Sequence, residues 1–257
     1  MNPRDIPAEA FHASGAEVQA IDFGYVRSPD QDRATPAQHP IVVIGAGPVG
    51  LSLAIDLAQR GQRVVVLDND HKLSIGSRAI CFAKRTLEIF DRLGCGDRMV
   101  DKGVSWNVGK VFFKSEEVYR FDLLPEPGHE RPAFINLQQY YVEGFLAERA
   151  AELPLIDIRW KHAVTGLDQQ ADFARLTIQT PDGPYQLDAD YVAACDGAGS
   201  ALRKLAGLES KGRSFRDRFL IADIKLKEEH SGLELKAERW FWFDPDFHRN
   251  QSVLLHM

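Results

Sequence analysis

The sequence has few cysteines and no long apolar run. Its three cysteines, Cys81, Cys95 and Cys195, form no Cys-x-x-Cys pair and leave one over, which indicates reduced thiols in a cytoplasmic protein. No run of about 18 apolar residues and no signal-peptide pattern occurs, so we expect no membrane span. The eight histidines lack the spacing of metal ligands, and we therefore expect no metal site.

Basic residues are fewer than acidic residues. Lysine and arginine together number 31 against 37 aspartate and glutamate residues, and the net charge of −6 argues against a nucleic-acid partner. Hydrophobic residues make up 44% and charged residues 26% of the chain, as in an ordinary globular protein. The 257 residues suffice for one large α/β domain, or for one domain and part of another.

The most specific pattern lies between Ile41 and Asp70. An apolar run leads into Gly45-Ala46-Gly47-Pro48-Val49-Gly50, a helical pattern follows, and a second apolar run over 64–67 ends at Asp68. This order of strand, glycine turn, helix, strand and acid is that of a dinucleotide-binding unit.

Each residue type in this unit has a physical purpose. Gly45 permits a tight turn, Gly47 lets the backbone approach a pyrophosphate, and Gly50 lets the helix pack against the strand. The pyrophosphate would lie on the N–H groups at the start of the helix. The carboxylate of Asp68 can accept hydrogen bonds from a ribose diol.

The rest of the chain predicts a mixture of helices and short strands, without an internal repeat. Residues 1 to about 38 form a polar extension that we expect to be partly disordered, with a linker-like stretch at 27–33. The periodicity predicts helices over 83–93 and 137–152. Strands are expected within 104–121, at 155–160, 163–167, 174–180 and 185–194, and from 219 onward.

Two further clusters receive a structural interpretation. The run Arg239-Trp240-Phe241-Trp242-Phe243 alternates like a strand, and packing in a core or an interface is favoured over an aromatic pocket. Arg213, Arg216 and Arg218 are expected to form a solvated basic edge.

Three blocks carry a resemblance to a known family. They are the glycine motif with Asp68, then Ser77-Arg78-Ala79 followed by the helix KRTLEIFDRLG and by Gln139 with Glu143 and Leu146, and finally Tyr191-Val192-Ala193-Ala194-Cys195-Asp196-Gly197-Ala198-Gly199-Ser200-Ala201-Leu202-Arg203. In this order they resemble the single-component FAD-dependent aromatic hydroxylases. The closest likeness is to phenol and 3-(3-hydroxyphenyl)propionate hydroxylases, over about residues 40 to 257.

The resemblance implies a fold class and a domain division. The fold would be α/β, an FAD/NAD(P)-binding Rossmann-like parallel sheet with an inserted, here incomplete, β-rich substrate domain. An FAD-binding domain would comprise 39–103 and 135–213, and a partial substrate domain 104–134 and 214–257. Strand 191–194 would return to the parallel sheet and place Asp196 near the glycine motif.

The resemblance also implies FAD as cofactor, NAD(P)H as electron donor, and a small aromatic substrate hydroxylated with O2 through a flavin C4a-hydroperoxide. Arg78 would contact the pyrophosphate–ribose region of FAD, and Gln139 would contact FAD from its helix. Asp196 would reach the ribitol or pyrophosphate region. The implied cofactor-binding residues are Gly45, Gly47, Pro48, Val49, Gly50, Asp68, Arg78, Gln139, Asp196, Gly197 and Arg203. No catalytic acid or base is assigned.

Several of these residues also have interpretations that involve no cofactor. Arg78 could be a solvated charge, Gln139 a helix surface residue, and Asp196-Gly197 a turn. The family's second flavin signature, Gly-Asp followed by Ala and His, is absent, so we expect the N-terminal portion of a longer hydroxylase, with little activity alone. The alternatives are a flavin oxidoreductase that does not hydroxylate and an FAD-binding fragment without turnover. The hypothesis of an NAD-dependent dehydrogenase is weaker, since it leaves the second and third blocks unexplained.

Overall fold

The computed structural model describes residues 6–75, 78–213, 215–216, 237–243 and 252–256. The chain divides into two compact units. The first comprises Met1–Gly76, Leu93–Cys95 and Gln139–Phe215, and the second comprises Ser77–Arg92, Gly96–Gln138 and Arg216–Met257. The domain boundaries expected from the sequence stay a prediction, because compactness alone assigns no function to a unit.

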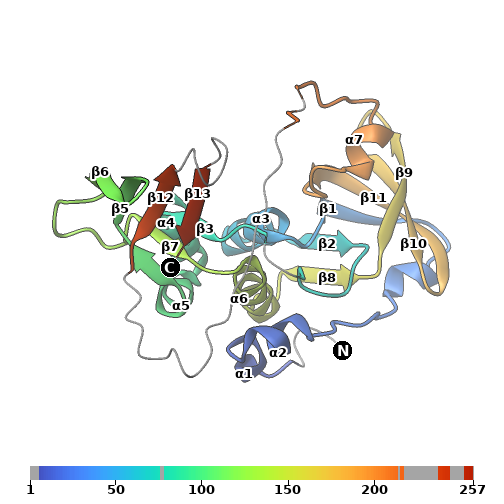
Figure 1. Ribbon diagram of the computed structural model, residues 1–257. Helices are drawn as coiled ribbons and strands as arrows, with labels where there is room; N and C mark the ends of the chain where they lie inside the picture. The colour runs from blue at the N-terminus through green and yellow to red at the C-terminus, as the bar shows by residue number, and fades with distance from the viewer. Residues whose placement is uncertain (1–5, 76–77, 214, 217–236, 244–251, 257) are drawn as a thin grey trace. The chain divides into compact units, whose positions relative to one another are not determined.

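The first unit is built on a six-stranded sheet in the order β8-β2-β1-β11-β10-β9 (Figure 1). Its strands are β1 (Ala37–Ile44), β2 (Val64–Asp68), β8 (Ile156–Trp160), β9 (Ala163–Gln169), β10 (Ala174–Thr180) and β11 (Gly183–Ala194). Strand β1 is parallel to both β2 and β11, and β8 is parallel to β2. The α/β class and the parallel sheet, including the returning strand 191–194, are therefore confirmed. Strand β10 is antiparallel to both of its neighbours, β11 and the edge strand β9.

Apolar side chains cover both faces of the central strands, which explains their uninterrupted apolar runs. Helix α3 (Pro48–Gln59) packs against β1, β2 and β8 and contacts α6 (Gln139–Glu152). On the other face lies a core cluster that also includes Leu202 of α7 (Ala201–Leu205). Its buried members are Val42, Ile44, Val65, Leu67, Leu176, Ile178, Tyr185, Leu187, Ala189 and Leu202.

The N-terminal extension packs against the first unit from residue 6 on. Helices α1 (Ala8–Phe11) and α2 (Gly15–Gln19) lie beside α6 (Figure 1). Phe11 is 1% exposed, and Val18 and Phe23 are 0% exposed, so these side chains belong to the core. The stretch 27–33 is not a linker: it contains the 3-10 helix Pro29–Asp32, with Ser28 and Asp30 buried.

The second unit holds two small sheets. Its elements are β3 (Cys81–Ala83), α4 (Lys84–Leu93, whose last residue joins the first unit), α5 (Gly96–Lys102), β4 (Val104–Trp106), β5 (Val108–Phe113), β6 (Glu116–Asp122), β7 (Phe134–Asn136), β12 (Arg239–Phe243) and β13 (Ser252–His256). The strand orders are β13-β12-β5-β6 and β3-β7-β4. A separate sheet joining 104–121 to the C-terminal strands is thus confirmed for β5, β6, β12 and β13, whereas β4 pairs in the other sheet. The predicted strand at 219–236 lies outside the described residues.

Aromatic rings pack on both faces of the four-stranded sheet. Trp240 and Trp242 lie on the face that carries Phe112, with ring centroids 5.5 and 5.4 Å from its ring. On the other face Phe121 crosses Gly109, where an added Cβ would lie 2.0 Å from the ring. This packing supports the interpretation of the aromatic run as a packed strand. In the described part of the chain, no helix is both long and apolar enough to cross a bilayer.

Candidate nucleotide-binding site

Two glycines of the loop between β1 and α3 are required by the fold itself. Gly45 has φ +105°, and a Cβ there would lie 2.4 Å from the carbonyl oxygen of Cys195. A Cβ on Gly50 would lie 1.8 Å from the carbonyl oxygen of Gly45. These positions leave no room for a side chain, so the turn and the close packing of the helix on the strand both depend on glycine.

Gly47 is different, because neither its backbone conformation nor its described surroundings require a glycine. Its φ of −75° suits any residue, and in the described part of the chain no atom beyond its two neighbours lies within 4 Å of an added Cβ. Gly47 is the N-cap of α3 and Pro48 follows it, and among the described residues no side chain caps this helix. The uncapped N-terminus therefore opens onto free space, as a site for a pyrophosphate requires. A Cβ would fill the space that such a ligand needs.

Asp68 connects the glycine loop to the loop that follows β2. Its Oδ2 accepts a hydrogen bond from the N–H of Ala46 at 2.5 Å, and its Oδ1 accepts one from the N–H of Asp70 at 2.7 Å. Burial raises the pKa of Asp68, and the two backbone hydrogen bonds only partly oppose this. Each oxygen retains a second lone pair, so further donors such as ribose hydroxyls would stabilise the buried charge. The bond to Ala46 is a feature that the sequence pattern did not predict.

The block after β11 lies against the glycine loop, as predicted. The N–H of Cys195 donates to the carbonyl of Ile44 at 2.8 Å, and an added Cβ on Gly45 would lie 3.1 Å from Cα of Asp196. The Asp196 carboxylate accepts hydrogen bonds from the Ser200 hydroxyl at 2.6 Å and from the Leu202 N–H at 3.0 Å. Burial raises the pKa of Asp196, but these hydrogen bonds outweigh burial and lower it overall.

This block is also a turn that caps a helix. Gly197 has φ +79°, and the hydroxyl of Ser200 accepts a hydrogen bond from the N–H of Arg203 at 2.9 Å. The guanidinium of Arg203 donates to the carbonyl of Ala198 at 2.9 Å and so closes the loop. The segment from Asp196 to Arg203 is therefore both a turn that caps α7 and a neighbour of the glycine loop.

Gln139 is fixed by a buried carboxylate that the sequence analysis did not count as a site residue. Gln139 Nε2 donates to Glu143 at 2.6 Å, one helical turn on. The other oxygen of Glu143, a residue only 6% exposed, accepts from the N–H of Ser74 at 2.6 Å. Glu143 thus joins α6 to the loop after β2. A buried glutamate one turn after a glutamine is the signal that could have pointed to it.

One predicted site residue belongs to the other unit. Arg78 is exposed and belongs to the second unit, so its contact with a cofactor stays a prediction. Among the described residues, no three His, Cys, Asp or Glu side chains cluster in a way that could hold a metal ion.

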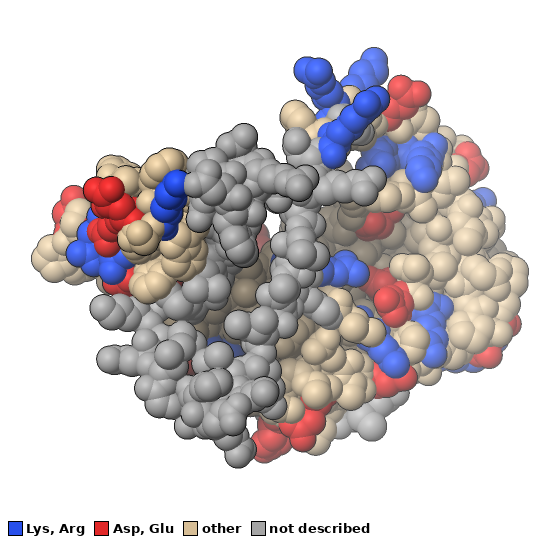
Figure 2. Space-filling model, viewed as in Figure 1, with Lys and Arg blue, Asp and Glu red and all other residues tan. Residues whose placement is uncertain are grey.

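Cationic side chains gather over α7 and the segment that follows it (Figure 2). Lys204, Lys211 and Arg213 are exposed there, and Arg216 is exposed as well. This exposure supports a solvated basic edge at Arg213 and Arg216, while Arg218 lies outside the described residues.

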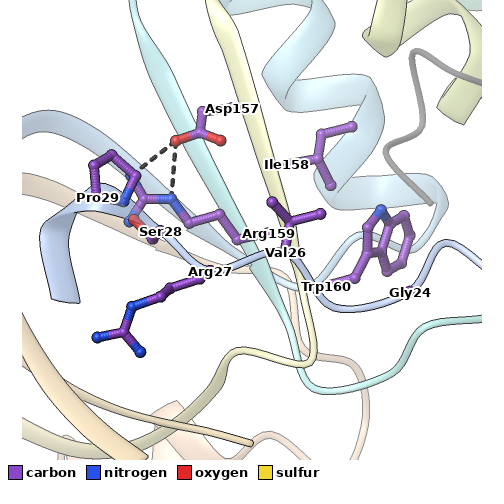
Figure 3. A pocket seen from close by; sticks show the side chains of 9 residues that line it. All are labelled: Gly24, Val26, Arg27, Ser28, Pro29, Asp157, Ile158, Arg159 and Trp160. Carbon is purple, nitrogen blue, oxygen red and sulfur yellow. Dashed lines mark hydrogen bonds and ion pairs between the residues drawn. The ribbon is translucent and has the colours of Figure 1, made fainter. Parts of the chain in front are cut away.

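A small pocket of the first unit lies between the N-terminal extension and β8. It is lined by Gly24 and residues 26–29 of the extension and by residues 157–160 of β8, and its volume is about 120 Å³ (Figure 3). Pockets that hold drug-sized ligands are roughly 300–1,000 Å³, so this one is too small for a dinucleotide.

The comparison with known proteins decides which dinucleotide the glycine loop serves. A family model described as "FAD binding domain" matches residues 38–246. The chain belongs to this family of FAD-binding domains. The match identifies the dinucleotide as FAD, and the open space at Gly47 fits its pyrophosphate.

Members of this FAD-binding family with similar sequences are monooxygenases. A 12-dehydrotetracycline 5-monooxygenase/anhydrotetracycline 6-monooxygenase of Streptomyces rimosus is 33% identical over 196 residues, which are 75% of this chain and 37% of that protein. A probable NADH-specific resorcinol 4-hydroxylase of Rhodococcus jostii is 30% identical over 194 residues, 74% of this chain and 36% of the other.

A solved structure agrees with these relatives. The crystal structure of p-nitrophenol 4-monooxygenase from Pseudomonas putida matches with a TM-score of 0.66 at 31% identity, covering 70% of this chain and 46% of that one. The chain spans less than half the length of each of these three relatives.

Proposed function

We propose that the protein is an FAD-dependent monooxygenase that hydroxylates a small aromatic substrate, with NAD(P)H as electron donor and O2 as co-substrate. The observation that carries the proposal is the open space at Gly47, beside an uncapped helix and close to Asp68 and Asp196, in a chain of the FAD-binding family. The names of the relatives, which include a resorcinol hydroxylase and a nitrophenol monooxygenase, support the reaction type. Three cysteines in the reduced form support the proposed cytoplasmic location.

The first unit would bind the adenosine and pyrophosphate parts of the cofactor. Gly47 and the following residues Pro48 and Val49 would bring the α3 N-terminus to the pyrophosphate, where the N–H groups and the helix dipole favour negative charge. Asp68, which is held by two backbone N–H groups, would accept the ribose hydroxyls.

The block after β11 would lie beside the pyrophosphate or the ribitol. Asp196 is held by Ser200 and the start of α7, and Gly197 leaves room for close approach. Arg203 would support this loop, and Gln139, held by Glu143, would donate or accept along the cofactor chain. Arg78 would add a cationic fork for phosphate oxygens.

When bound, FAD would supply the redox chemistry, with NAD(P)H as the reductant and O2 as the oxidant that provides one oxygen atom to the aromatic product and the other to water. The protein's own part is to bind and orient the flavin and to exclude water from it. Neither a metal nor a nucleophilic side chain is needed for this chemistry, and we assign no catalytic acid or base.

The test is reconstitution of the purified chain with FAD, followed by oxidation of NADH or NADPH with a panel of phenols under isotopically labelled O2. We expect bound flavin to absorb at about 450 nm. Labelled oxygen should enter the aromatic product only in small amount, because we expect little activity from this chain alone. The Gly47→Val variant is the control, since it should lose the cofactor and with it the product.

The alternatives give different results. NAD(P)H oxidation that yields only H2O2 would indicate a flavin oxidoreductase that does not hydroxylate. Bound FAD without any NAD(P)H oxidation would indicate a binding fragment without turnover. A chain that binds no FAD would contradict the proposed function as a whole.

A further inference from the structure

Residues 21–31, which we call the N-terminal strap, lie along the loop that follows Asp68. The N–H of Phe23 donates to the carbonyl of His71 at 2.9 Å, and Asp22 forms a β-bridge with Lys72. The Asp22 carboxylate is also 3.6 Å from Nε2 of His71. The strap precedes residue 38, where the match to the family begins. It is therefore an element of this chain outside the matched region.

The ring of Phe23 anchors the strap beside Asp68. Phe23 is 0% exposed and stacks on Trp160, with ring centroids 4.2 Å apart and an angle of 6° between the planes. Trp160 is the residue of β8 that pairs with Asp68 of β2. The stacked rings therefore stand next to the end of β2, where the ribose of FAD would be held.

The strap is fixed at its far end as well. Asp30 accepts a hydrogen bond from Arg159 at 2.7 Å, and Arg159 is 6% exposed. Figure 3 shows Gly24 to Pro29 of the strap facing the end of β8 around the small pocket. The strap is therefore fixed to β8 at two points, by the ring of Phe23 near its start and by Asp30 near its end.

A continuous set of hydrogen bonds leads from the strap to the glycine loop. His71 is held by Phe23, and its neighbour Asp70 donates its N–H to Asp68 at 2.7 Å. The other carboxylate oxygen of Asp68 accepts the Ala46 N–H at 2.5 Å. The position of the loop after Asp68 therefore sets the orientation of this carboxylate.

We propose that the N-terminal strap positions the adenosine half of bound FAD, with Phe23 as its main positioning residue. The strap holds the loop after Asp68, and this loop orients the carboxylate toward the ribose. The inference rests on the proposed function, because it takes FAD as the ligand. It extends the nucleotide site to residues that contact no part of the cofactor.

The test compares Phe23→Ala with Leu176→Ala in the full chain. Leu176 is also 0% exposed, and it belongs to the core cluster with β10 and β11. FAD and ADP are titrated against each variant at a temperature where thermal denaturation shows both to be folded. We expect Phe23→Ala to raise the dissociation constants of FAD and ADP about tenfold. Leu176→Ala should change both constants less than about twofold.

Hydrogen exchange without ligand gives a second readout. Peptides that cover residues 68–73 should exchange faster in Phe23→Ala and at the wild-type rate in Leu176→Ala. If Phe23→Ala fails to fold, Phe23→Leu keeps most of the buried volume while removing the stacked ring, and it replaces the first variant in both measurements.

The outcomes separate the two proposals. If the wild-type chain binds neither FAD nor ADP, the proposed function fails and this inference fails with it. If the wild-type chain binds both, equal losses in the two variants, or no loss in Phe23→Ala, would overturn the role of the strap alone. A wild-type rate of hydrogen exchange over residues 68–73 in Phe23→Ala would also overturn the role of the strap.

Discussion

A valine at position 47 should separate cofactor binding from folding. The φ of Gly47 is −75° and its ψ is −177°, values that a β-branched residue adopts without strain. Among the described residues beyond its two chain neighbours, none has an atom within 4 Å of the added Cβ. The change from glycine to valine at an N-cap costs about 1 kcal/mol of helix stability, so most of the fold should remain.

The loss of affinity should be far larger than this loss of stability. A side chain at Gly47 would occupy the space from which a pyrophosphate reaches the N–H groups of α3. Each hydrogen bond to a charged group contributes about 1.5–3 kcal/mol, so the loss of two would weaken FAD binding by about 10² to 10⁴-fold.

Gly50→Ala is the matched control in the same loop. Its Cβ would lie 1.8 Å from the carbonyl oxygen of Gly45, so the backbone must shift. We expect a loss of about 3 kcal/mol or more in the free energy of unfolding, since such overpacking against backbone has no flexible side chain to absorb it.

The assay is urea denaturation of both variants without FAD, followed by a titration with FAD at low denaturant. Gly47→Val should have nearly the wild-type midpoint and almost no affinity, whereas Gly50→Ala should have a lowered midpoint. The reasoning is wrong if Gly47→Val binds FAD as tightly as the wild type, or if it unfolds as easily as Gly50→Ala.

Three more predictions concern other contacts of the first unit. Burial alone would raise the pKa of Asp30, but His39 and Arg159 lower it from 3.8 to about 2, so its stabilisation is present above about pH 4 and is lost as the pH falls toward 2. Between about pH 5 and pH 2 the free energy of unfolding should therefore fall by about 2 kcal/mol more in the wild type than in Asp30→Asn, and parallel curves would refute this. Ser200→Ala should cost about 1 kcal/mol by removing the cap of α7, and it should lower FAD affinity less than Asp196→Ala, which removes the carboxylate itself; equal FAD affinities in the two variants would limit Asp196 to a structural role. Glu143→Ala leaves the donors of Ser74 and Gln139 without their acceptor and should cost about 2 kcal/mol or more, measured by thermal denaturation against Glu152→Ala, a partly exposed residue on the same helix.

The sequence predicted the parts of the fold that depend on local patterns. The strand, turn and helix around Gly45 to Gly50 carry their own signals, and so do α4 and α6, whose ends differ from the predicted ones by no more than two residues. The place of Asp196 beside Gly45 was predicted from the resemblance to a family, because no local pattern shows which strand returns to β1.

The sequence did not predict how the extension packs. Phe11, Val18 and Phe23 are isolated among polar neighbours and do not belong to a sustained helical or strand period, so their burial was not visible in the pattern. The 3-10 helix at Pro29–Asp32 is stabilised by the ion pair of Asp30 with Arg159, which lies far away in the sequence. Contacts of this kind depend on the tertiary fold and leave no local signal.

The pairing of β1 with β11 has a consequence for how this protein folds during synthesis. Ile44 pairs with Ala194, about 150 positions later, so β1 leaves the ribosome long before its partner exists. Until then one edge of β1 exposes unpaired backbone groups next to the apolar side chains of Val42 and Val43, which is a template for aggregation. The nascent chain therefore has a long interval in which chaperones, rather than its own structure, must protect this edge. The cofactor can assist only at the end of this interval, since the loop at Gly45 is completed by Cys195 and Asp196.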